Sequence, residues 1–543
     1  MGKRLVDKRN RFGIRKLSVG VCSVVVATCF LGVTTSYAEE QAENSEPREE
    51  RVETSNAGDQ GKEEKTVNEH QEESEQPSPA TSEKENRTVS QGTEASQPAT
   101  SLDEETEIAD YGPLPSKAQM QYHREELAAF IHFGMNTYYD REWGDGQEDP
   151  YYFYPEHLDT DQWIKTLKEA GFKRTIMVVK HHDGFLLYPS KYTDHTIAKS
   201  GWKEGKGDVL AEVSASASKY DMDMGVYLSP WDAHSPLYHV DTEDQYNEYY
   251  LNQLKEILED PKYGNKGKFV EVWMDGARGD GAQKVTYTFD KWFEAIRKAQ
   301  GDIAIFSAEP TNVRWIGNEK GIAGDPVWQK VNPDKIRNNP SNSYLNHGDP
   351  EGKQYSVGEA DVSIRSGWFY HDNQEPKSLR ELMDIYFKSV GRGTPLLLNI
   401  PPNQDGKFAD ADVARLKEFR QTLDQLYSVN YAAGALVEAD STRRNPLYKA
   451  SHLTDGDEKT SWAPADDAKT GSFVLDLGKE QHFDVVELKE TIEKGQRISG
   501  FNIDVAVNGQ WVPFGAGSTV GYRRLIKGQP VDSRYIRVSI TDA

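Results

Sequence analysis

Residues 269–276, which read FVEVWMDG, are a β-rich run that ends in a carboxylate, Asp275, directly before a glycine. The run predicts a β-strand with an acid at its carboxyl end. Reacting groups in a parallel α/β barrel lie at the carboxyl ends of the strands, which favours a catalytic role for Asp275. Asp-Gly is also a common turn pair, so the octapeptide alone leaves a turn-capping role for Asp275 equally open.

Strand-like and helix-like patterns alternate around this run, over residues 111–432. The predicted strands are 128–135, 174–180, 224–231, 268–276, 303–309 and 395–400, and the predicted helices are 163–170, 243–258, 289–299, 379–390 and 410–426. Strand and helix in turn indicate a parallel sheet covered by helices. The number of units and the length of the segment favour a (β/α)8-like TIM barrel over an open doubly wound sheet. In this chain, no glycine-rich nucleotide fingerprint follows the first predicted strand.

Polar and aromatic side chains gather at the predicted strand ends. The first strands end in FIHFGMN (130–136), KHHDGF (180–185) and YLSPWD (227–232), and the fourth ends at Asp275. These ends would meet at one mouth of the barrel. Imidazoles and carboxylates there can bind sugar hydroxyls, while an aromatic ring stacks on the apolar face of a sugar. Candidate aromatic platforms are Trp143, Tyr188, Trp231, Trp315 and Trp368.

The cluster His181, His182 and Asp183 also raises the question of a metal site. Adjacent residues of a strand point to opposite faces, so both histidines could bind one ion only if the strand has already ended. No cysteine, His-Glu-x-x-His motif or second histidine pair supports a zinc centre. Hydroxyl-binding histidines are favoured, and structural core histidines or a metal site stay open.

Six motifs in order resemble those of glycoside hydrolase family 29, the α-L-fucosidases. They are FIHFGMN (130–136), DREWGDG (140–146), KHHDGF (180–185), YPSKYTD (188–194), WMDGA (273–277) and LLNIPPN (397–403). Together they cover nearly the whole predicted barrel. The resemblance implies a retaining mechanism, in which one carboxylate attacks the anomeric carbon and a second carboxyl group protonates the leaving oxygen.

By this resemblance Asp275 matches the family nucleophile, and we expect Glu319 to be the acid/base. Glu319 lies in RWIGNEKG (314–321), and its surroundings resemble the family branch that acts on α-1,3/1,4-linked fucose. Glu309, which ends the fifth predicted strand, is the competing candidate. A third interpretation makes Glu319 a solvated loop acid beside Lys320.

The same resemblance implies a set of residues that bind fucose hydroxyls or pack against its ring. The set is His132, Glu142, Trp143, His181, His182, Tyr227, Trp231, Trp315 and Trp368. Alternatives stay open for three members: Trp143 could plug the barrel mouth, Tyr227 could be a core residue, and Glu142 could pair with Arg141 on the surface. The resemblance implies no cofactor for catalysis, and the expected partners are fucosylated oligosaccharides or glycoconjugates.

The N-terminus predicts export. Residues 1–38 combine a basic region, an apolar stretch from Leu17 to Val33 and the small-x-small sequence Ser36-Tyr37-Ala38, as in a signal peptide. FGIRK (12–16) resembles the YSIRK-type signal of Gram-positive cocci, which implies a secreted or cell-surface protein. The chain contains no Leu-Pro-x-Thr-Gly sorting motif, so wall anchoring stays open, and we expect no stable membrane insertion of the mature form.

The signal segment contains both cysteines, Cys22 and Cys29, so we expect the mature protein to use neither disulfides nor a thiol nucleophile. Residues 39–110 are acidic and lack Phe, Trp and Tyr, which predicts a disordered spacer. The formal net charge of the whole chain is -24, and no basic stripe is present, so a nucleic-acid partner is not expected.

Residues 433–543 change to short strands and turns. ASHLTDGDEKTSW (450–462) and the alternating run 471–477 resemble a discoidin-type β-sandwich, akin to carbohydrate-binding module family 32. Asp455 and Asp457 could supply oxygens to a structural calcium, or they could simply form an Asx-rich turn. We expect this sandwich to lack its last strand.

Three functions follow as hypotheses from these resemblances. The first is a secreted retaining exo-α-L-fucosidase that releases α-1,3/1,4-linked fucose from Lewis-type host glycans. The second is an α-L-fucosidase of broader specificity, acting on α-1,2 links or aryl fucosides. The third is a non-catalytic glycan-binding adhesin, against which the intact pair of carboxylates argues.

Overall fold

The structure is a computed structural model of the 543-residue chain, and it describes residues 24–27 and 107–543 except 239–242, 280–284, 458 and 466–467. Most of the predicted signal peptide, with both cysteines, and the predicted spacer up to residue 106 lie outside the described residues. The described part contains no helix that is long and apolar enough to cross a membrane.

Parallel strands close into a barrel in the order β10-β11-β2-β3-β4-β5-β6-β7. The strands are β2 (Leu127–Ile131), β3 (Arg174–Lys180), β4 (Asp223–Leu228), β5 (Glu271–Trp273), β6 (Ala304–Phe306), β7 (Val313–Trp315), β10 (Val357–Ser363) and β11 (Leu396–Asn399). The prediction of a TIM-like barrel is therefore confirmed. The sequence run 269–276 contains β5, and Asp275 lies just beyond the end of that strand.

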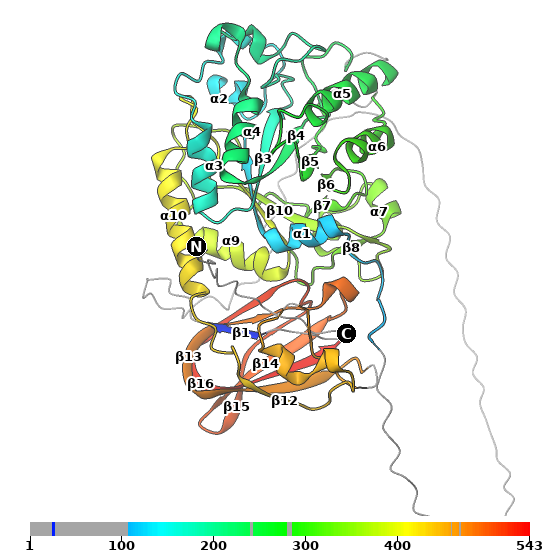
Figure 1. Ribbon diagram of the computed structural model, residues 1–543, viewed down its shortest axis with the longest axis vertical. Helices are drawn as coiled ribbons and strands as arrows, with labels where there is room; N and C mark the ends of the chain where they lie inside the picture. Colours follow the sequence, from blue (N-terminus) through cyan, green and yellow to red (C-terminus); the bar gives the residue numbers. More distant parts are fainter. Residues whose placement is uncertain (1–23, 28–106, 239–242, 280–284, 458, 466–467) are drawn as a thin grey trace, which may run out of the picture. The chain divides into compact units, whose positions relative to one another are not determined.

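Helices cover the outside of the barrel (Figure 1). They are α1 (Lys117–Glu125), α2 (Met135–Tyr139), α3 (Thr160–Glu169), α4 (Val209–Tyr220), α5 (Glu243–Leu258), α6 (Phe289–Gln300), α7 (Pro333–Arg337), α8 (Asn342–His347), α9 (Leu379–Lys388) and α10 (Asp410–Leu426). A short hairpin of β8 (Lys330–Val331) and β9 (Gln354–Tyr355) lies between β7 and β10 along the chain.

Alternate residues of each strand serve two separate cores. Inward-facing residues such as Phe130, Tyr227 and Trp273 pack together in the barrel interior. Their neighbours along the same strands, such as Ile131 and Val272, join the larger core between the strands and the helices. Because both faces of the strands are buried, a strand such as β2 reads as an apolar run rather than an alternating one.

A buried ion-pair cluster ties α1 to the barrel strands. The Arg174 guanidinium on β3 donates to Glu271 on β5 at 2.7 Å and also to Glu125 at the end of α1, and all three groups are largely buried. The same guanidinium lies over the ring of Tyr122, 4.2 Å from its centroid. These contacts fix the first helix against the barrel.

The C-terminal domain is an antiparallel sheet with its own apolar core, as predicted for residues 433–543. Its strands are β12 (Leu436–Ala439), β13 (Gly471–Leu488), β14 (Gly500–Val507), β15 (Gln510–Gly517) and β16 (Arg524–Asp542). A further strand, β1 (Val24–Ala27), pairs with residues 485–488 of β13. Since β1 lies within the predicted signal peptide, cleavage of that peptide would remove this neighbour of β13.

The barrel and the C-terminal domain belong to one compact unit. The buried Gln496 amide of the C-terminal domain accepts a hydrogen bond from the backbone N–H of Gln329 at 2.8 Å and donates one to the carbonyl of Val327 at 2.9 Å. Arg523 forms an ion pair with Glu126, in the segment between α1 and β2. The two domains are therefore joined by specific, buried polar contacts.

Candidate active site

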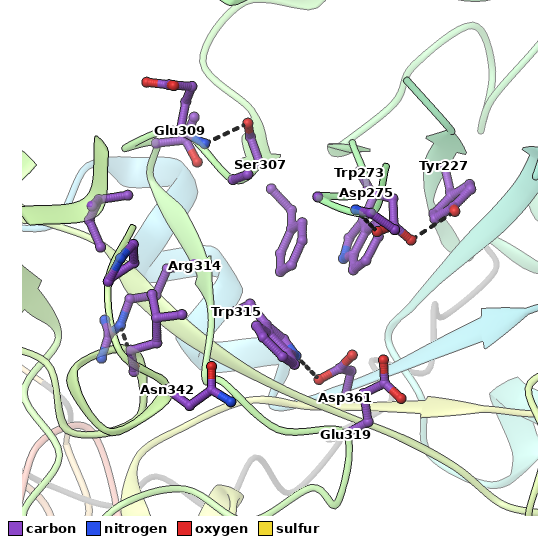
Figure 2. Close-up of a pocket in the computed structure, with 18 of the residues that line it drawn as sticks. Tyr227, Trp273, Asp275, Ser307, Glu309, Arg314, Trp315, Glu319, Asn342 and Asp361 are labelled. Carbon is purple, nitrogen blue, oxygen red and sulfur yellow. Dashed lines mark hydrogen bonds between the residues drawn. The ribbon is translucent and has the colours of Figure 1, made fainter. Parts of the chain in front are cut away.

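A pocket with a volume of about 480 Å³ opens at the carboxyl ends of the barrel strands (Figure 2). Most of the predicted site residues line it. These are His132, Trp143, His181, His182, Tyr227, Asp275, Trp315, Glu319 and Trp368. They come from the ends of β2, β3, β4, β5, β7 and β10 and the loops that follow, so residues far apart in the sequence are brought to one place.

Asp275 has one oxygen in a turn and the other directed toward the pocket residues. Its Oδ1 atom accepts a hydrogen bond from the backbone N–H of Ala277 at 2.8 Å, the contact expected of a turn-forming aspartate. Its Oδ2 atom accepts from the hydroxyl of Tyr227 at 2.9 Å, and the Nε2 atom of His182 lies 3.7 Å from the same oxygen. The contact with Ala277 fits the turn-forming interpretation, and the same turn holds the carboxylate at the pocket, where the catalytic interpretation needs it.

Glu319 lies on the loop after β7, and its Oε2 atom accepts a hydrogen bond from the indole N–H of Trp368 at 3.3 Å. Burial and the neighbouring negative charge of Asp275 raise the pKa of Glu319, although the Trp368 hydrogen bond opposes this rise. The loop is fixed by Gly321, whose N–H donates to the carbonyl of Asp361 at 3.1 Å. A carboxyl group with a raised pKa is suited to holding a proton until it is needed.

Glu309, the competing acid, also lines the pocket but has a different partner. Its carboxylate lies 3.4 Å from the Nε atom of Arg337, and both side chains are partly exposed. In Figure 2 the Glu309 side chain lies apart from Asp361 and Glu319, which are drawn together, and from Asp275, which lies next to Tyr227. The partner of Glu309 is therefore a cation, whereas Glu319 contacts an aromatic wall of the pocket.

The pocket histidines are held in the neutral state by burial. His132 contacts the Asn399 side-chain oxygen through Nδ1 at 2.8 Å, and burial lowers its pKa to about 3. His182 contacts the Ser229 hydroxyl at 2.8 Å, and burial lowers its pKa as well, as it does for His181. A neutral imidazole can both donate and accept, which suits the recognition of sugar hydroxyls.

His181 and His182 both line the pocket because β3 ends at Lys180, directly before them. Their ring centroids are 4.1 Å apart. In the part of the chain that the structure describes, no group of three or more His, Cys, Asp or Glu side chains is arranged to hold a metal ion. The arrangement of the two rings favours the hydroxyl-binding interpretation over a core role.

Aromatic rings form the walls of the pocket. The ring of Trp368 lies 5.2 Å from that of His132, and Trp143 stands edge-on to His182 at 5.7 Å. Trp143 is 60% exposed, so it does not plug the barrel mouth. Trp231 stacks on His182 at 4.5 Å and is buried, so it supports the imidazole from behind.

Glu142 does not pair with Arg141. Its carboxylate accepts hydrogen bonds from the backbone N–H groups of Trp368 at 2.7 Å and Phe369 at 3.3 Å, and it contacts His371 at 2.6 Å. Burial alone would lower the pKa of His371, but contacts with acids, Glu142 among them, raise it. Glu142 therefore fixes the segment that carries Trp368, one of the walls of the pocket.

The structure also places in the pocket a carboxyl group that the sequence analysis missed. Asp361 on β10 is 3% exposed, and its Oδ1 atom accepts a hydrogen bond from the indole N–H of Trp315 at 3.0 Å (Figure 2). Burial and the adjacent charge of Glu319 raise the pKa of Asp361 well above its usual range. In β10 (VGEADVS), acidic residues alternate with small or polar ones, and this alternation is typical of a strand. The two acids suggest an exposed face, although the whole strand is buried.

The predicted calcium ligands lie in an exposed turn of the C-terminal domain. Asp455 accepts hydrogen bonds from the backbone N–H of Asp457 at 3.4 Å and the hydroxyl of Thr460 at 3.3 Å. Asp457 in turn accepts from the N–H of Lys459. These contacts are those of an Asx-rich turn, and calcium binding stays a prediction.

Models of known families match three parts of the chain. The sequence model described as Alpha-L-fucosidase matches residues 117–425, that of the F5/8 type C domain matches 437–543, and that of the YSIRK type signal peptide matches 7–32. The signal match confirms the prediction of secretion.

Curated relatives and solved structures agree with these matches. Putative alpha-L-fucosidase 1 of Oryza sativa subsp. japonica is 40% identical over 79% of this chain and 83% of its own length. The crystal structure of SpGH29 is 59% identical and superposes with a TM-score of 0.79 over 80% of this chain and 96% of its own. A Ruminococcus gnavus GH29 fucosidase, solved in complex with fucose, is 40% identical with a TM-score of 0.77 over 82% and 95% of the two chains.

The barrel, the pocket at its strand ends and the matches over more than half of the sequence lead to one assignment. The adhesin hypothesis is thereby set aside in favour of an enzyme. The chain belongs to the α-L-fucosidases of glycoside hydrolase family 29.

Proposed function

We propose that this α-L-fucosidase releases α-1,3/1,4-linked L-fucose from Lewis-type host glycans by a retaining mechanism, with Asp275 as nucleophile and Glu319 as acid/base. The proposal rests on two carboxyl groups that line one pocket: one is held in a fixed orientation by hydrogen bonds, and the other has a raised pKa. Asp275 is held by Tyr227 and the backbone, and the pKa of the neighbouring Glu319 is raised.

In the first step Asp275 attacks the anomeric carbon of fucose while Glu319 gives its proton to the glycosidic oxygen. The bond between fucose and the remaining glycan breaks, and a covalent fucosyl ester forms on Asp275. In the second step the Glu319 carboxylate takes a proton from water, whose oxygen attacks the same carbon and frees Asp275. Two inversions at one carbon leave the configuration of the released fucose unchanged.

The surrounding residues have roles consistent with this chemistry. The Tyr227 hydroxyl donates to Asp275 and orients the attacking carboxylate. The neutral imidazoles of His132, His181 and His182 would hold fucose hydroxyls, and the rings of Trp143, Trp315 and Trp368 would pack against the sugar. For the C-terminal domain we propose glycan binding or support of the barrel, with a structural calcium at Asp455 and Asp457.

Substituting the two candidate acids separately distinguishes their roles. Glu319→Gln is expected to lower kcat on a fucosylated oligosaccharide by roughly 10²–10⁴-fold, because proton transfer to the leaving group is lost. An aryl fucoside with an acidic leaving group needs less protonation and should be less affected. Glu309→Gln is the matched control and should retain activity on both substrates.

Added azide gives a second readout for the same pair of variants. If Glu319 is the acid/base, azide should restore turnover of Glu319→Gln on the aryl fucoside and give a fucosyl azide of retained configuration. Loss of activity in Glu309→Gln with an active Glu319→Gln would overturn the assignment.

Linkage specificity needs a comparison of substrates. The wild-type protein should release fucose from a Lewis-type trisaccharide much faster than from an α-1,2-fucosylated one, as measured by free fucose. Equal or inverted rates would favour the alternative of broader specificity, and would leave the assignments of Asp275 and Glu319 untouched.

A further inference from the structure

A short segment of the loop that carries Trp143 exposes three aromatic rings to solvent. Tyr151, Tyr152 and Tyr154, in the loop between α2 and α3, are 67%, 62% and 52% exposed. Single exposed aromatic residues need no explanation, but a contiguous group of them on a folded surface indicates a binding site. These three residues are called the tyrosine platform below.

The rings of the platform are contiguous. The centroids of Tyr151 and Tyr152 are 6.4 Å apart, and a fourth ring, Tyr139, stands edge-on to Tyr152 at 5.9 Å. A Cβ atom placed on Gly201 would lie 3.2 Å from the ring of Tyr151 and 3.6 Å from that of Tyr154, so these two rings flank the bare backbone of Gly201. The rings therefore form one aromatic surface, and the residue between two of them has no side chain.

The platform is anchored rather than loose. Phe153, between the exposed tyrosines, is fully buried and packs against Phe133 and Phe185. Asp149 caps the 3-10 turn through the N–H of Tyr151, and its own N–H donates to the hydroxyl of Tyr139 at 2.9 Å. A rigid surface loses little conformational entropy on binding, because its rings are already in place.

The same loop reaches the active-site pocket. It carries Trp143, which lines the pocket, and the buried Glu148 carboxylate, which accepts hydrogen bonds from the backbone N–H groups of Asp145 and Gly146. The loop follows β2, so it lies on the barrel face where the strands end. A chain of sugars that leaves the pocket past Trp143 would meet surface built by the same loop.

The side chains of the tyrosine platform and the charges around it favour one class of ligand over others. Each tyrosine offers an apolar ring face to the C–H face of a pyranose and a hydroxyl group to its hydroxyls. Exposed acids (Asp140, Asp145, Asp149 and Glu156) and exposed cations (Arg141, Lys199 and Lys203) both surround it, so it lacks the single-sign basic surface that an anionic membrane or a nucleic acid needs. A neutral, hydroxyl-rich chain fits better than either.

We propose that the tyrosine platform binds pyranose residues of the glycan chain that carries the fucose, at a distance from the cleaved bond. The platform extends the substrate site beyond the pocket and favours long or protein-attached glycans over short ones. This inference rests on the proposed action on fucosylated glycans, but it does not depend on which linkage is cleaved.

The test compares substrates of different length in a triple variant, Tyr151→Ala with Tyr152→Ala and Tyr154→Ala. Its kcat/KM on an aryl fucoside and on the shortest cleaved trisaccharide should stay within about twofold of the wild type. On a long fucosylated poly-N-acetyllactosamine chain, KM should rise roughly tenfold, because stacking contacts are lost while the chemistry is unchanged. Tyr535→Ala removes an exposed tyrosine of the C-terminal domain and is the matched control.

A binding measurement without fucose separates this inference from the proposed function. Non-fucosylated poly-N-acetyllactosamine, which lacks the sugar for the pocket, should bind the wild type and the Tyr535→Ala control more tightly than the triple variant in calorimetry. Equal binding, or an equal loss of activity on short and long substrates, would overturn the platform. A change in linkage preference alone would contradict only the proposed specificity.

Discussion

At the scale of single residues, three of the four carboxyl groups that line the pocket, those of Asp275, Glu319 and Asp361, have clearly different environments. Asp275 receives two hydrogen bonds that hold it in place, Glu319 accepts one from the indole N–H of Trp368, and Asp361 is deeply buried and accepts one from Trp315. Burial raises the pKa of Glu319 and, far more, that of Asp361. Environments that separate the protonation of neighbouring acids assign them different roles, and Asp361 is expected to stay neutral through the cycle.

Substituting Asp361 tests this protonation state. If Asp361 is neutral, Asp361→Asn changes no charge near Glu319, so the alkaline limb of the kcat/KM profile should stay in place, and the amide oxygen can still accept from Trp315. Asp361→Ala removes the acceptor and should lower kcat through a misplaced Trp315. If Asp361 were ionised, Asp361→Asn would remove a negative charge, lower the pKa of Glu319 and move the alkaline limb to lower pH.

At the scale of secondary structure, the barrel depends on a few buried charges as well as on apolar packing. Arg174 on β3 satisfies Glu271 on β5 and Glu125 on α1, so one side chain joins three elements. Breaking such a pair from one side leaves a buried charge without a partner. This is why the cluster matters more for stability than the exposed ion pairs on the helices.

Arg174→Met should lower the free energy of unfolding by about 3–5 kcal/mol, because two carboxylates lose their buried partner. Chemical denaturation of the purified protein measures this loss. Lys219→Met is the control, since it removes a cation from the exposed pair with Asp161 and should have no measurable effect. Similar losses in both variants would contradict the account of the cluster.

The sequence predicted several long elements well, but it missed helix α4 and two strands of the barrel. The bounds of β3 (Arg174–Lys180), α5 (Glu243–Leu258) and α10 (Asp410–Leu426) were predicted residue for residue. Strand β7 was missed because three residues carry too little periodicity, and β10 because Glu359 and Asp361 suggest exposure. The two acids of β10 are buried in the barrel interior, where tertiary packing overrides the local sequence signal.

The site residues also divide into those whose place could be predicted from the sequence and those whose place could not. Asp275 and the histidines follow strands with clear sequence patterns, so their convergence could be predicted from the parallel barrel. The contact of Glu142 with Trp368 joins residues 226 positions apart, and the place of Trp231 behind His182 depends on side-chain packing. Neither follows from sequence spacing, because loops fix their relative positions.

At the scale of the whole molecule, the C-terminal domain contributes to the barrel through buried polar contacts. Gln496 supplies both a donor and an acceptor to the backbone of residues 327–329. These backbone groups belong to the segment between β7 and β8, close in sequence to Glu319. The domain therefore supports the part of the chain that follows the proposed acid/base.

Gln496→Leu should destabilise the protein by about 1–3 kcal/mol, because it leaves a buried N–H and a buried carbonyl without partners. Thermal unfolding followed by circular dichroism measures the change. Gln510→Leu alters an exposed glutamine of the same domain and should leave the midpoint unchanged. An unchanged midpoint for Gln496→Leu would show that the domains are stabilised independently.

The most direct test of the central claim is to trap the covalent intermediate. A 2-deoxy-2-fluoro-fucosyl fluoride forms the ester on the nucleophile quickly and loses it slowly, because fluorine destabilises the second transition state. Proteolysis and mass spectrometry of the inactivated protein should find the fluorofucosyl group on Asp275. Attachment to any other residue, or turnover of the reagent with no labelled protein, would contradict the account.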